Sequence, residues 1–253
     1  MSDLKNIKIL FEDDSVVVID KPAGVMVHED GKEKKWPVLT DWFLEKYPDS
    51  AKVGQDIQTD SGEVISRPGI VHRLDRETSG VMILCKTQDS FEFIKEQFKN
   101  REVQKTYNAF CYGKVRFDEG SIDKEIGRSK QFGKWTAMEN SLRGTSRDAL
   151  TEYKTLIAGN NYSFVELMPK TGRTHQIRVH LQFLQNPVVA DKMYAGKRAE
   201  NDGVENLFFK RQALHAKKIK FKKMDGEMVE IESELPTDFQ IAYKFLDEIS
   251  NIC

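Results

Sequence analysis

The sequence contains few cysteines and no long apolar segment. Its 253 residues include three cysteines, Cys85, Cys111 and Cys253, and their spacing is not that of a metal site. So small and odd a number favours reduced thiols over a disulfide framework. No stretch approaches the length of a membrane span, and residues 1–10 lack the apolar core and cleavage site of a signal peptide. We therefore expect a soluble cytoplasmic protein with no membrane partner.

The sequence also lacks a large net charge, because charged segments of opposite sign cancel. The formal net charge is −1. Residues 1–64 hold 8 Lys/Arg against 14 Asp/Glu, and residues 225–253 hold 1 against 8, whereas residues 65–224 hold 30 against 18. A basic middle between acidic ends is typical of a surface that binds a polyanion, although solvated lysine-rich faces have the same composition. Charge alone therefore leaves nucleic acid as one option among several.

Short strands outnumber helices in the hydrophobic pattern. Alternating or β-branched segments predict strands, and 3.6-residue spacing predicts helices. The predicted strands are 15–20, 80–86, 105–112, 151–157, 162–168, 216–221 and 228–231, the last two joined by a turn at 225–226. The predicted helices are 41–47, 90–100 with Asp89 as N-cap, 174–184, and one opened by Pro236. Residues 49–67 are expected to form a surface loop, and residues 118–148 an insertion or flexible loop. This pattern predicts an α+β domain with a mixed, mostly antiparallel sheet flanked by helices and loops.

The segment 71–81 (VHRLDRETSGV) places basic residues on both sides of a carboxylate. Arg73 and Arg76 flank Asp75, and Glu77 follows. Neighbouring guanidinium groups lower the pKa of an aspartate and keep it ionised. An ionised carboxylate in a partly dry pocket can act as a nucleophile or a base. Because an isolated aspartate more often caps a turn or pairs with a surface arginine, Asp75 is a catalytic candidate that needs further context.

The segment 169–181 (PKTGRTHQIRVHL) is a turn that leads into a helix rich in cationic groups. Arg173 and Arg178 alternate with His175 and His180 around the predicted helix start. The spacing of the two histidines is a poor zinc signal, because no cysteine or carboxylate accompanies them at ligand spacing. A basic surface helix and a functional patch explain this segment equally well.

The segment 105–107 (KTY) carries Tyr107 on a predicted strand. A tyrosine on a strand is usually a core or edge residue. Its ring can also stack on a nucleobase, as aromatic side chains do in RNA-binding proteins. The core interpretation is favoured unless other residues place Tyr107 beside Asp75.

Taken together, these segments resemble the RluA-type pseudouridine synthases. The matches run in family order from about residue 12 to residue 216, which is nearly the whole chain. The motifs at 72–80 (HRLD followed by TSG) and 171–180 (TGRTHQIRVH) are long, and their joint occurrence is highly specific. The supporting motifs are 20–24 (DKPAG) with 27–28 (VH), 105–107 (KTY), Pro187 with Asp191, and 214–216 (LHA).

The resemblance implies an isomerase that converts uridine to pseudouridine in structured RNA, either ribosomal or transfer RNA. It implies that Asp75 is the essential carboxylate. Tyr107 would stack on the target base, and Arg178 would pair with Asp75 and orient it. The implied fold is the pseudouridine synthase catalytic domain.

The resemblance also implies substrate contacts. Arg73 would contact the RNA and help to hold the target nucleotide out of its stack, and Leu214 would form an apolar wall of the pocket. Arg173 would bind the substrate as part of the cationic patch. The histidines of these motifs are expected to be structural residues or phosphate contacts: His72, His175 and His180.

Many relatives carry a small RNA-binding domain before the catalytic one. Here the first motif begins close to the N-terminus, so we expect a single catalytic domain over 1–253, with two subdomains around a cleft and no separate N-terminal RNA-binding domain. RNA selection is then expected from the catalytic domain itself. The basic segment 126–147 is a candidate for additional contacts, with a solvated loop as an equally weighted alternative. A monomer is the default.

Uridine isomerisation requires neither redox chemistry nor phosphoryl transfer, so no cofactor or metal is expected. The carboxylate can attack the sugar, add to the base, or remove a sugar proton, and the sequence does not choose among these routes. One rival interpretation is a glycosidase-like hydrolase that uses Asp75 with Glu77. A second rival is an RNA-binding module without catalysis.

Overall fold

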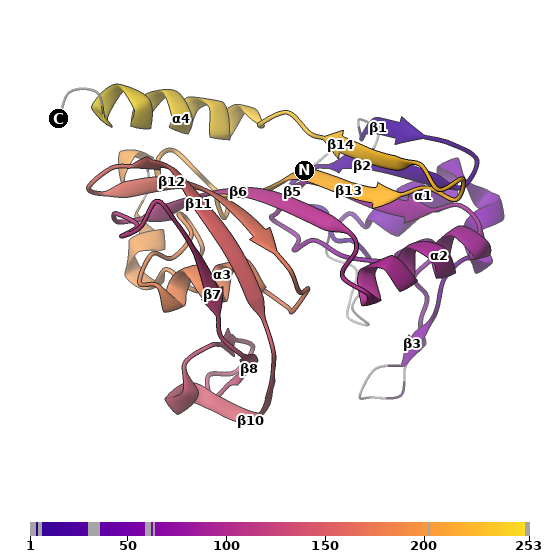
Figure 1. Ribbon diagram of the computed structural model, residues 1–253, viewed down its shortest axis with the longest axis horizontal. Helices are drawn as coiled ribbons and strands as arrows, with labels where there is room; N and C mark the ends of the chain where they lie inside the picture. Colours follow the sequence, from indigo (N-terminus) through magenta and orange to yellow (C-terminus); the bar gives the residue numbers. More distant parts are fainter. Residues whose placement is uncertain are drawn as a thin grey trace. The chain divides into compact units, whose positions relative to one another are not determined.

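The computed structural model describes residues 4, 7–29, 36–58, 62, 64–201 and 203–250. The chain divides into two compact units (Figure 1). Unit 1 comprises Met1–Gln104 and Ala216–Ser233, and unit 2 comprises Lys105–His215 and Glu234–Cys253. Each unit is therefore built from two separate segments of the chain.

Unit 1 is built on a sheet with mostly antiparallel strand pairs. Its strands are β1 (Lys8–Glu12), β2 (Val16–Lys21), β3 (Ile57–Gln58), β4 (Val64–Ile65), β5 (Ser79–Cys85), β13 (Leu214–Lys222) and β14 (Met228–Glu232), and its helices are α1 (Leu39–Lys46), η2 (Pro48–Lys52) and α2 (Gln88–Lys99). The strand order is β1-β2-β5-β13-β14, and β3 pairs separately with β4. Buried apolar residues of β2, β5 and β13 pack with Phe91 and Ile94 of α2. This arrangement explains the uninterrupted apolar character of β5, which is buried along its whole length.

Two expectations for unit 1 were wrong in detail. Thr87, and not Asp89, is the N-cap of α2, because its side chain accepts a hydrogen bond from the backbone N–H of Ser90. The Ser90 hydroxyl lies near the backbone N–H of Thr87 in return, which makes a capping box. The segment 49–67, expected to be a surface loop, contains most of η2 and the paired strands β3 and β4. Backbone hydrogen bonds can form strands from polar residues whose sequence shows no hydrophobic alternation.

Unit 2 is built on a second set of antiparallel strands. Its strands are β6 (Gln104–Tyr112), β7 (Glu119–Asp123), β8 (Ile126–Ser129), β9 (Trp135–Thr136), β10 (Leu142–Arg147), β11 (Leu150–Ala158) and β12 (Tyr162–Pro169), and its helices are η3 (Glu139–Ser141), α3 (Gln176–Phe183), η4 (Gly196–Glu200), η5 (Gly203–Asn206) and α4 (Thr237–Ser250). The main order is β6-β12-β11-β7, and a small sheet has the order β10-β8-β9. In Figure 1 the small sheet lies beyond the ends of β7 and β11.

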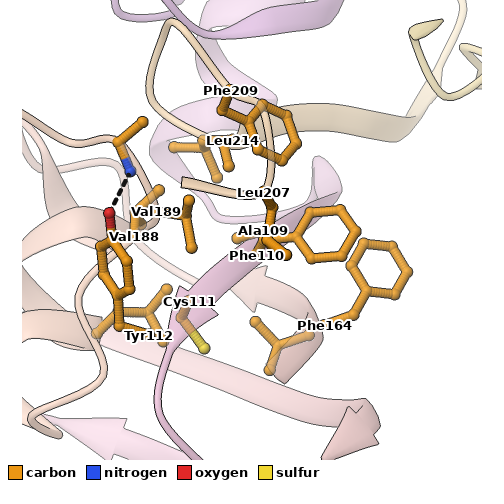
Figure 2. Close-up of a cluster of buried hydrophobic side chains, with 14 of the residues drawn as sticks. Ala109, Phe110, Cys111, Tyr112, Phe164, Val188, Val189, Leu207, Phe209 and Leu214 are labelled. Atoms are coloured by element: carbon orange, nitrogen blue, oxygen red, sulfur yellow. Dashed lines mark hydrogen bonds between the residues drawn. The ribbon is translucent and has the colours of Figure 1, made fainter. Parts of the chain in front are cut away.

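The core of unit 2 is aromatic at its centre (Figure 2). Phe110 of β6 is stacked on Phe164 of β12, with ring centroids 4.6 Å apart, and it also contacts Phe209 and Phe239. Phe239 belongs to α4, which buries this residue completely. The predicted C-terminal helix is therefore confirmed, and its apolar face completes the core of this unit.

The expectation of a loop at 118–148 was wrong, because most of this segment forms strands. Its few buried apolar residues, including Ile126 and Ala137, pack against Val179 and Tyr194, which are distant in sequence. The pairing of β8 with β9 and β10 supplies the remaining order. Because the residues that these strands pack against lie elsewhere in the chain, the local sequence shows no hydrophobic alternation from which the strands could be predicted.

The glycine of the TSG motif, Gly80, lies where two strands of unit 1 pack closely. Gly80 has a φ of 113°, a conformation that side chains rarely adopt. A Cβ atom at this position would lie 2.1 Å from the backbone oxygen of Ala216 in β13. The glycine thus lets β13 approach the strand that follows the Asp75 loop.

We expect Gly80→Ala to lower the free energy of unfolding by about 3–5 kcal/mol, because backbone strain and steric overlap add. Gly172→Ala is the matched control, since an added Cβ there meets no atom within 4 Å. It should change stability by less than about 1 kcal/mol. Urea titration of both variants provides the comparison, and equal stabilities would show that the close approach is not a constraint.

Candidate active site

Asp75 lies on a half-buried loop immediately before β5. The backbone N–H of Thr78 donates to the carbonyl oxygen of Asp75 at 3.1 Å and closes a turn. Leu74 on one side and Thr78 on the other are buried. The loop is therefore anchored at both ends around the aspartate.

Lys21 of the DKPAG motif holds this loop from inside unit 1. The side chain is fully buried, and its Nζ donates to the carbonyl oxygens of Pro22 at 2.9 Å, Val25 at 3.0 Å and Arg76 at 3.2 Å. The backbone N–H of Gly24 donates to the same Arg76 carbonyl at 2.8 Å. Hydrogen bonds from a charged donor are stronger than neutral ones. The first motif thus fixes the backbone of the residue that follows Asp75.

The charged residues around Asp75 differ in their surroundings. Arg73 is exposed, and its Nη1 lies 3.5 Å from Nε2 of His28. Arg76 pairs with Glu77 at 3.1 Å, and its guanidinium lies 4.0 Å from the centroid of the Trp36 ring. Glu77 is therefore engaged with a neighbouring side chain of its own loop.

His72 of the HRLD motif has a structural role. Its Nε2 accepts a hydrogen bond from the backbone N–H of Ile83 in β5 at 3.0 Å. Its ring stacks on Phe98 of α2 at a centroid distance of 4.8 Å. The imidazole therefore connects the Asp75 loop to both β5 and α2, as expected for a structural residue.

Arg178 lies on α3 of unit 2 and is buried with a carboxylate partner. Its Nε and Nη2 donate to the two carboxylate oxygens of Asp191 at 2.6 and 2.8 Å. The backbone N–H groups of Met193 and Tyr194 donate to Asp191 Oδ1, and the Tyr194 ring lies 4.9 Å from the guanidinium carbon. This bidentate geometry fixes the plane of the guanidinium group.

The TGRTHQIRVH motif is held by a buried hydrogen-bond network. The Gln176 Oε1 accepts from the Thr171 hydroxyl at 2.7 Å, and its Nε2 donates to the Thr151 hydroxyl at 3.0 Å. His180 is fully buried between the Thr151 hydroxyl at 2.9 Å and the carbonyl oxygen of Lys124 at 3.0 Å. The carbonyl requires a donor, so Nε2 carries the proton and Nδ1 accepts from Thr151. This network secures the start of α3 and hence Arg178.

The remaining predicted residues of unit 2 have different degrees of exposure. Tyr107 is half-buried on β6, opposite Leu167. Arg173 donates from Nε to the carbonyl oxygen of Asp148 at 3.0 Å. Leu214 is buried with the core residues shown in Figure 2. Leu214 therefore packs in the core of unit 2. Its expected role as a wall of the substrate pocket remains a prediction.

Sequence reasoning missed the residues that support the predicted site. The motif matches include Lys21 and Asp191 without assigning either a role, and Tyr194 lies outside them. Lys105 was also passed over. Its Nζ lies 3.3 Å from the carbonyl oxygen of Thr171, and burial lowers the pKa of this lysine to about 8. All four residues lie in or beside the matched motifs, which was the only available signal.

Replacing Lys21 with methionine should lower the free energy of unfolding by about 2–4 kcal/mol. The side chain keeps its length, but three carbonyl groups lose a charged donor inside the protein. Lys46→Met in the last turn of α1 is the control for the loss of one lysine. Chemical denaturation measures both, and a stability loss no greater for Lys21→Met than for Lys46→Met would contradict this role.

We also expect stability to depend on pH through His180. Burial lowers the pKa of His180 below its ordinary value of 6.5, because the charged form is poorly solvated. The unfolded chain then binds a proton that the folded protein does not, so stability should fall as the pH drops below about 6.5, by at most about 1.4 kcal/mol per pH unit.

Unfolding free energies measured between pH 7.5 and 5.5 check this expectation. His180→Gln keeps a donor and an acceptor but does not titrate. Its stability should show a shallower pH dependence than that of the unmodified protein. The same slope in both proteins would assign the effect to another group.

Two observations limit the kinds of site that the described residues can form. No helix among them is long and apolar enough to cross a membrane. Within the same part of the chain, no group of three or more His, Cys, Asp or Glu side chains is arranged to hold a metal ion.

Comparison with known proteins agrees with this arrangement. Residues 15–183 match the family model described as RNA pseudouridylate synthase. The chain is 35% identical over 96% of its length to the ribosomal large subunit pseudouridine synthase D of Xanthomonas campestris, covering 70% of that protein. It is 31% identical over 95% of its length to the protein of the same name from Zymomonas mobilis, covering 73% of it.

A solved structure shows the same fold. The human RNA pseudouridylate synthase domain-containing protein 4 is 26% identical to the chain, with a TM-score of 0.70, and the match covers 94% of this chain and 92% of that one. The α+β fold with its mostly antiparallel strands is therefore that of a pseudouridine synthase domain. With the motifs, the family model and the relatives in agreement, the chain belongs to the RluA-type RNA pseudouridine synthases, which are isomerases.

Proposed function

We propose that the chain isomerises uridine to pseudouridine in the RNA of the large ribosomal subunit, with Asp75 as the catalytic carboxylate. The observation that carries this proposal is the buried Arg178–Asp191 pair within the TGRTHQIRVH motif region. A cation held so rigidly suits the task of orienting a second carboxylate. The names of the similar bacterial proteins favour ribosomal over transfer RNA.

Arg178 has more donors than its partner Asp191 requires. A guanidinium group carries five N–H bonds, and the bidentate pair uses one on Nε and one on Nη2. We assign to this guanidinium group the further task of orienting Asp75 in the reacting enzyme. A guanidinium partner favours the ionised carboxylate, which is the form that each of the possible reactions requires.

The reaction breaks the bond between the sugar and N1 of uracil, turns the base, and joins the sugar to C5. The hydrogen on C5 is released as a proton and N1 takes up a proton, so the atoms balance without a cofactor. Asp75 can attack the sugar carbon, add to the base or remove a sugar proton, and each route needs the base outside its stack. Extruding a base costs a few kcal/mol, and stacking on Tyr107 would return roughly 1–3 kcal/mol.

The substrate contacts extend this assignment to the RNA. Arg73 is exposed two residues before Asp75, which supports its assignment to contacting the RNA and holding the extruded nucleotide. Arg173 and Leu214 are assigned to substrate binding on the strength of the motif matches alone. An enzyme that acts on ribosomal RNA would work in the cytoplasm, and we propose that it acts as a monomer.

The rival interpretations predict different products. A hydrolase that uses Asp75 with Glu77 would release free uracil, whereas an isomerase would not. An RNA-binding module would release neither uracil nor the C5 hydrogen. The buried charge pair at Arg178 has no evident use in such a module.

Asp75→Asn should abolish turnover while leaving RNA affinity within about threefold, because the amide keeps the size of the side chain but removes its charge. Turnover is measured as tritium released from large-subunit ribosomal RNA transcribed with uridine labelled at C5. Glu77→Gln is the matched control and should retain tritium release. Release by Asp75→Asn, or free uracil from the unmodified enzyme, would contradict the proposal.

A further inference from the structure

The tip of the β8–β9 hairpin, residues 129–134, is an ordered turn. The backbone N–H of Ser129 donates to the carbonyl oxygen of Lys134 at 2.9 Å, and the N–H of Lys134 donates to that of Gln131 at 3.2 Å. The Ser129 hydroxyl also accepts from the backbone N–H of Gln131 at 3.1 Å. Gly133 has a φ of 76°, which allows the turn to close.

Phe132 is presented to solvent at this tip. Its exposed fraction is 97%, the largest of the exposed large hydrophobic residues in the part of the chain that the structure describes. A phenylalanine adds nothing to stability when it is fully hydrated, since its contribution comes from area removed from water. Its neighbours are cations: Lys130, whose Nζ donates to the carbonyl oxygen of Asn140 at 3.0 Å, and Lys134.

The charge around the tip has one dominant sign. Residues 126–147 include five Lys/Arg and one Asp/Glu. The Arg128 guanidinium lies 5.5 Å from the centroid of the Trp135 ring. A basic surface with a projecting aromatic ring combines the two features that bind single-stranded nucleic acid, namely cations for the backbone and a face for stacking a base.

The base of the hairpin is joined to the residues that hold Arg178. The backbone N–H of Trp135 donates to the Tyr194 hydroxyl at 3.1 Å, and this hydroxyl lies 2.8 Å from Nδ1 of His175. The ring of Tyr194 lies against Arg178. The hairpin and Arg178 therefore share an anchor within unit 2.

We propose that this tip is a second RNA contact, in which Phe132 stacks on an unpaired base that is not the target uridine. The inference rests on the proposed action on ribosomal RNA. It adds that the RNA substrate must contain an unpaired nucleotide at a fixed position relative to the uridine that is isomerised. The lysines beside Phe132 would contact the phosphates on either side of the stacked base.

Substitutions at Phe132 separate stacking from simple apolar contact. Phe132→Ala should raise KM for unmodified large-subunit ribosomal RNA transcript about five- to hundredfold, the range found for single stacked bases, with kcat within twofold. Phe132→Trp should keep the original KM, whereas Phe132→Leu should resemble the alanine variant. The exposed side chain leaves the folded state intact in each case, which the urea midpoint verifies.

Phe117→Ala is the matched control, because Phe117 is also exposed in unit 2 and has a neighbouring arginine, Arg116, near its ring. It should leave KM unchanged. An unchanged KM for Phe132→Ala, or a Phe132→Leu variant with the original KM, would overturn the stacking contact.

A binding measurement separates this inference from the proposed function. RNA affinity is compared for Asp75→Asn alone and for Asp75→Asn combined with Phe132→Ala, so that no turnover intervenes. Weaker RNA binding by the double variant than by Asp75→Asn alone supports the tip contact. This holds even if the unmodified enzyme releases no tritium, because the absence of tritium release would contradict only the proposed function. Equal affinities, or no RNA binding at all, would overturn the tip contact.

Discussion

The ion pair between Arg178 and Asp191 is the interaction on which the candidate site of unit 2 depends. Both side chains are nearly inaccessible to solvent, and burying a charge costs several kcal/mol unless a partner compensates. The bidentate contact, the two backbone donors to Asp191 and the ring of Tyr194 together provide that compensation. The same contacts hold the guanidinium group in one orientation.

Unit 1 also contains a buried cation, which holds the backbone of the loop that carries Asp75. There the buried cation, Lys21, donates to three backbone carbonyls, one of them that of the residue next to Asp75. The glycine at position 80 brings β13 against the strand after the same loop. The loop that carries the carboxylate is thus held through backbone contacts, which restrict its movement.

The sequence predicted the elements that carry their own hydrophobic period. β5, α3 and the β13–β14 hairpin follow the expected ranges within a few residues, because each buries a face defined by local spacing. The strands between 118 and 148 were missed, since their core is completed by Val179 and Tyr194. The cap of α2 was misplaced by two residues because Thr87 and Asp89 are both good capping residues, and only the backbone geometry selects between them.

The motifs were informative about function because each combines a charged residue with the neutral residues that position it. In TGRTHQIRVH the glutamine, the second histidine and the first threonine are all bound within the protein, which leaves the arginines to interact with other charges. In HRLD the histidine is bound to β5, next to the exposed Arg73. A single aspartate or arginine occurs by chance in any chain, but a complete set of supporting donors and acceptors does not. This is why two long motifs identified the family where composition and net charge could not.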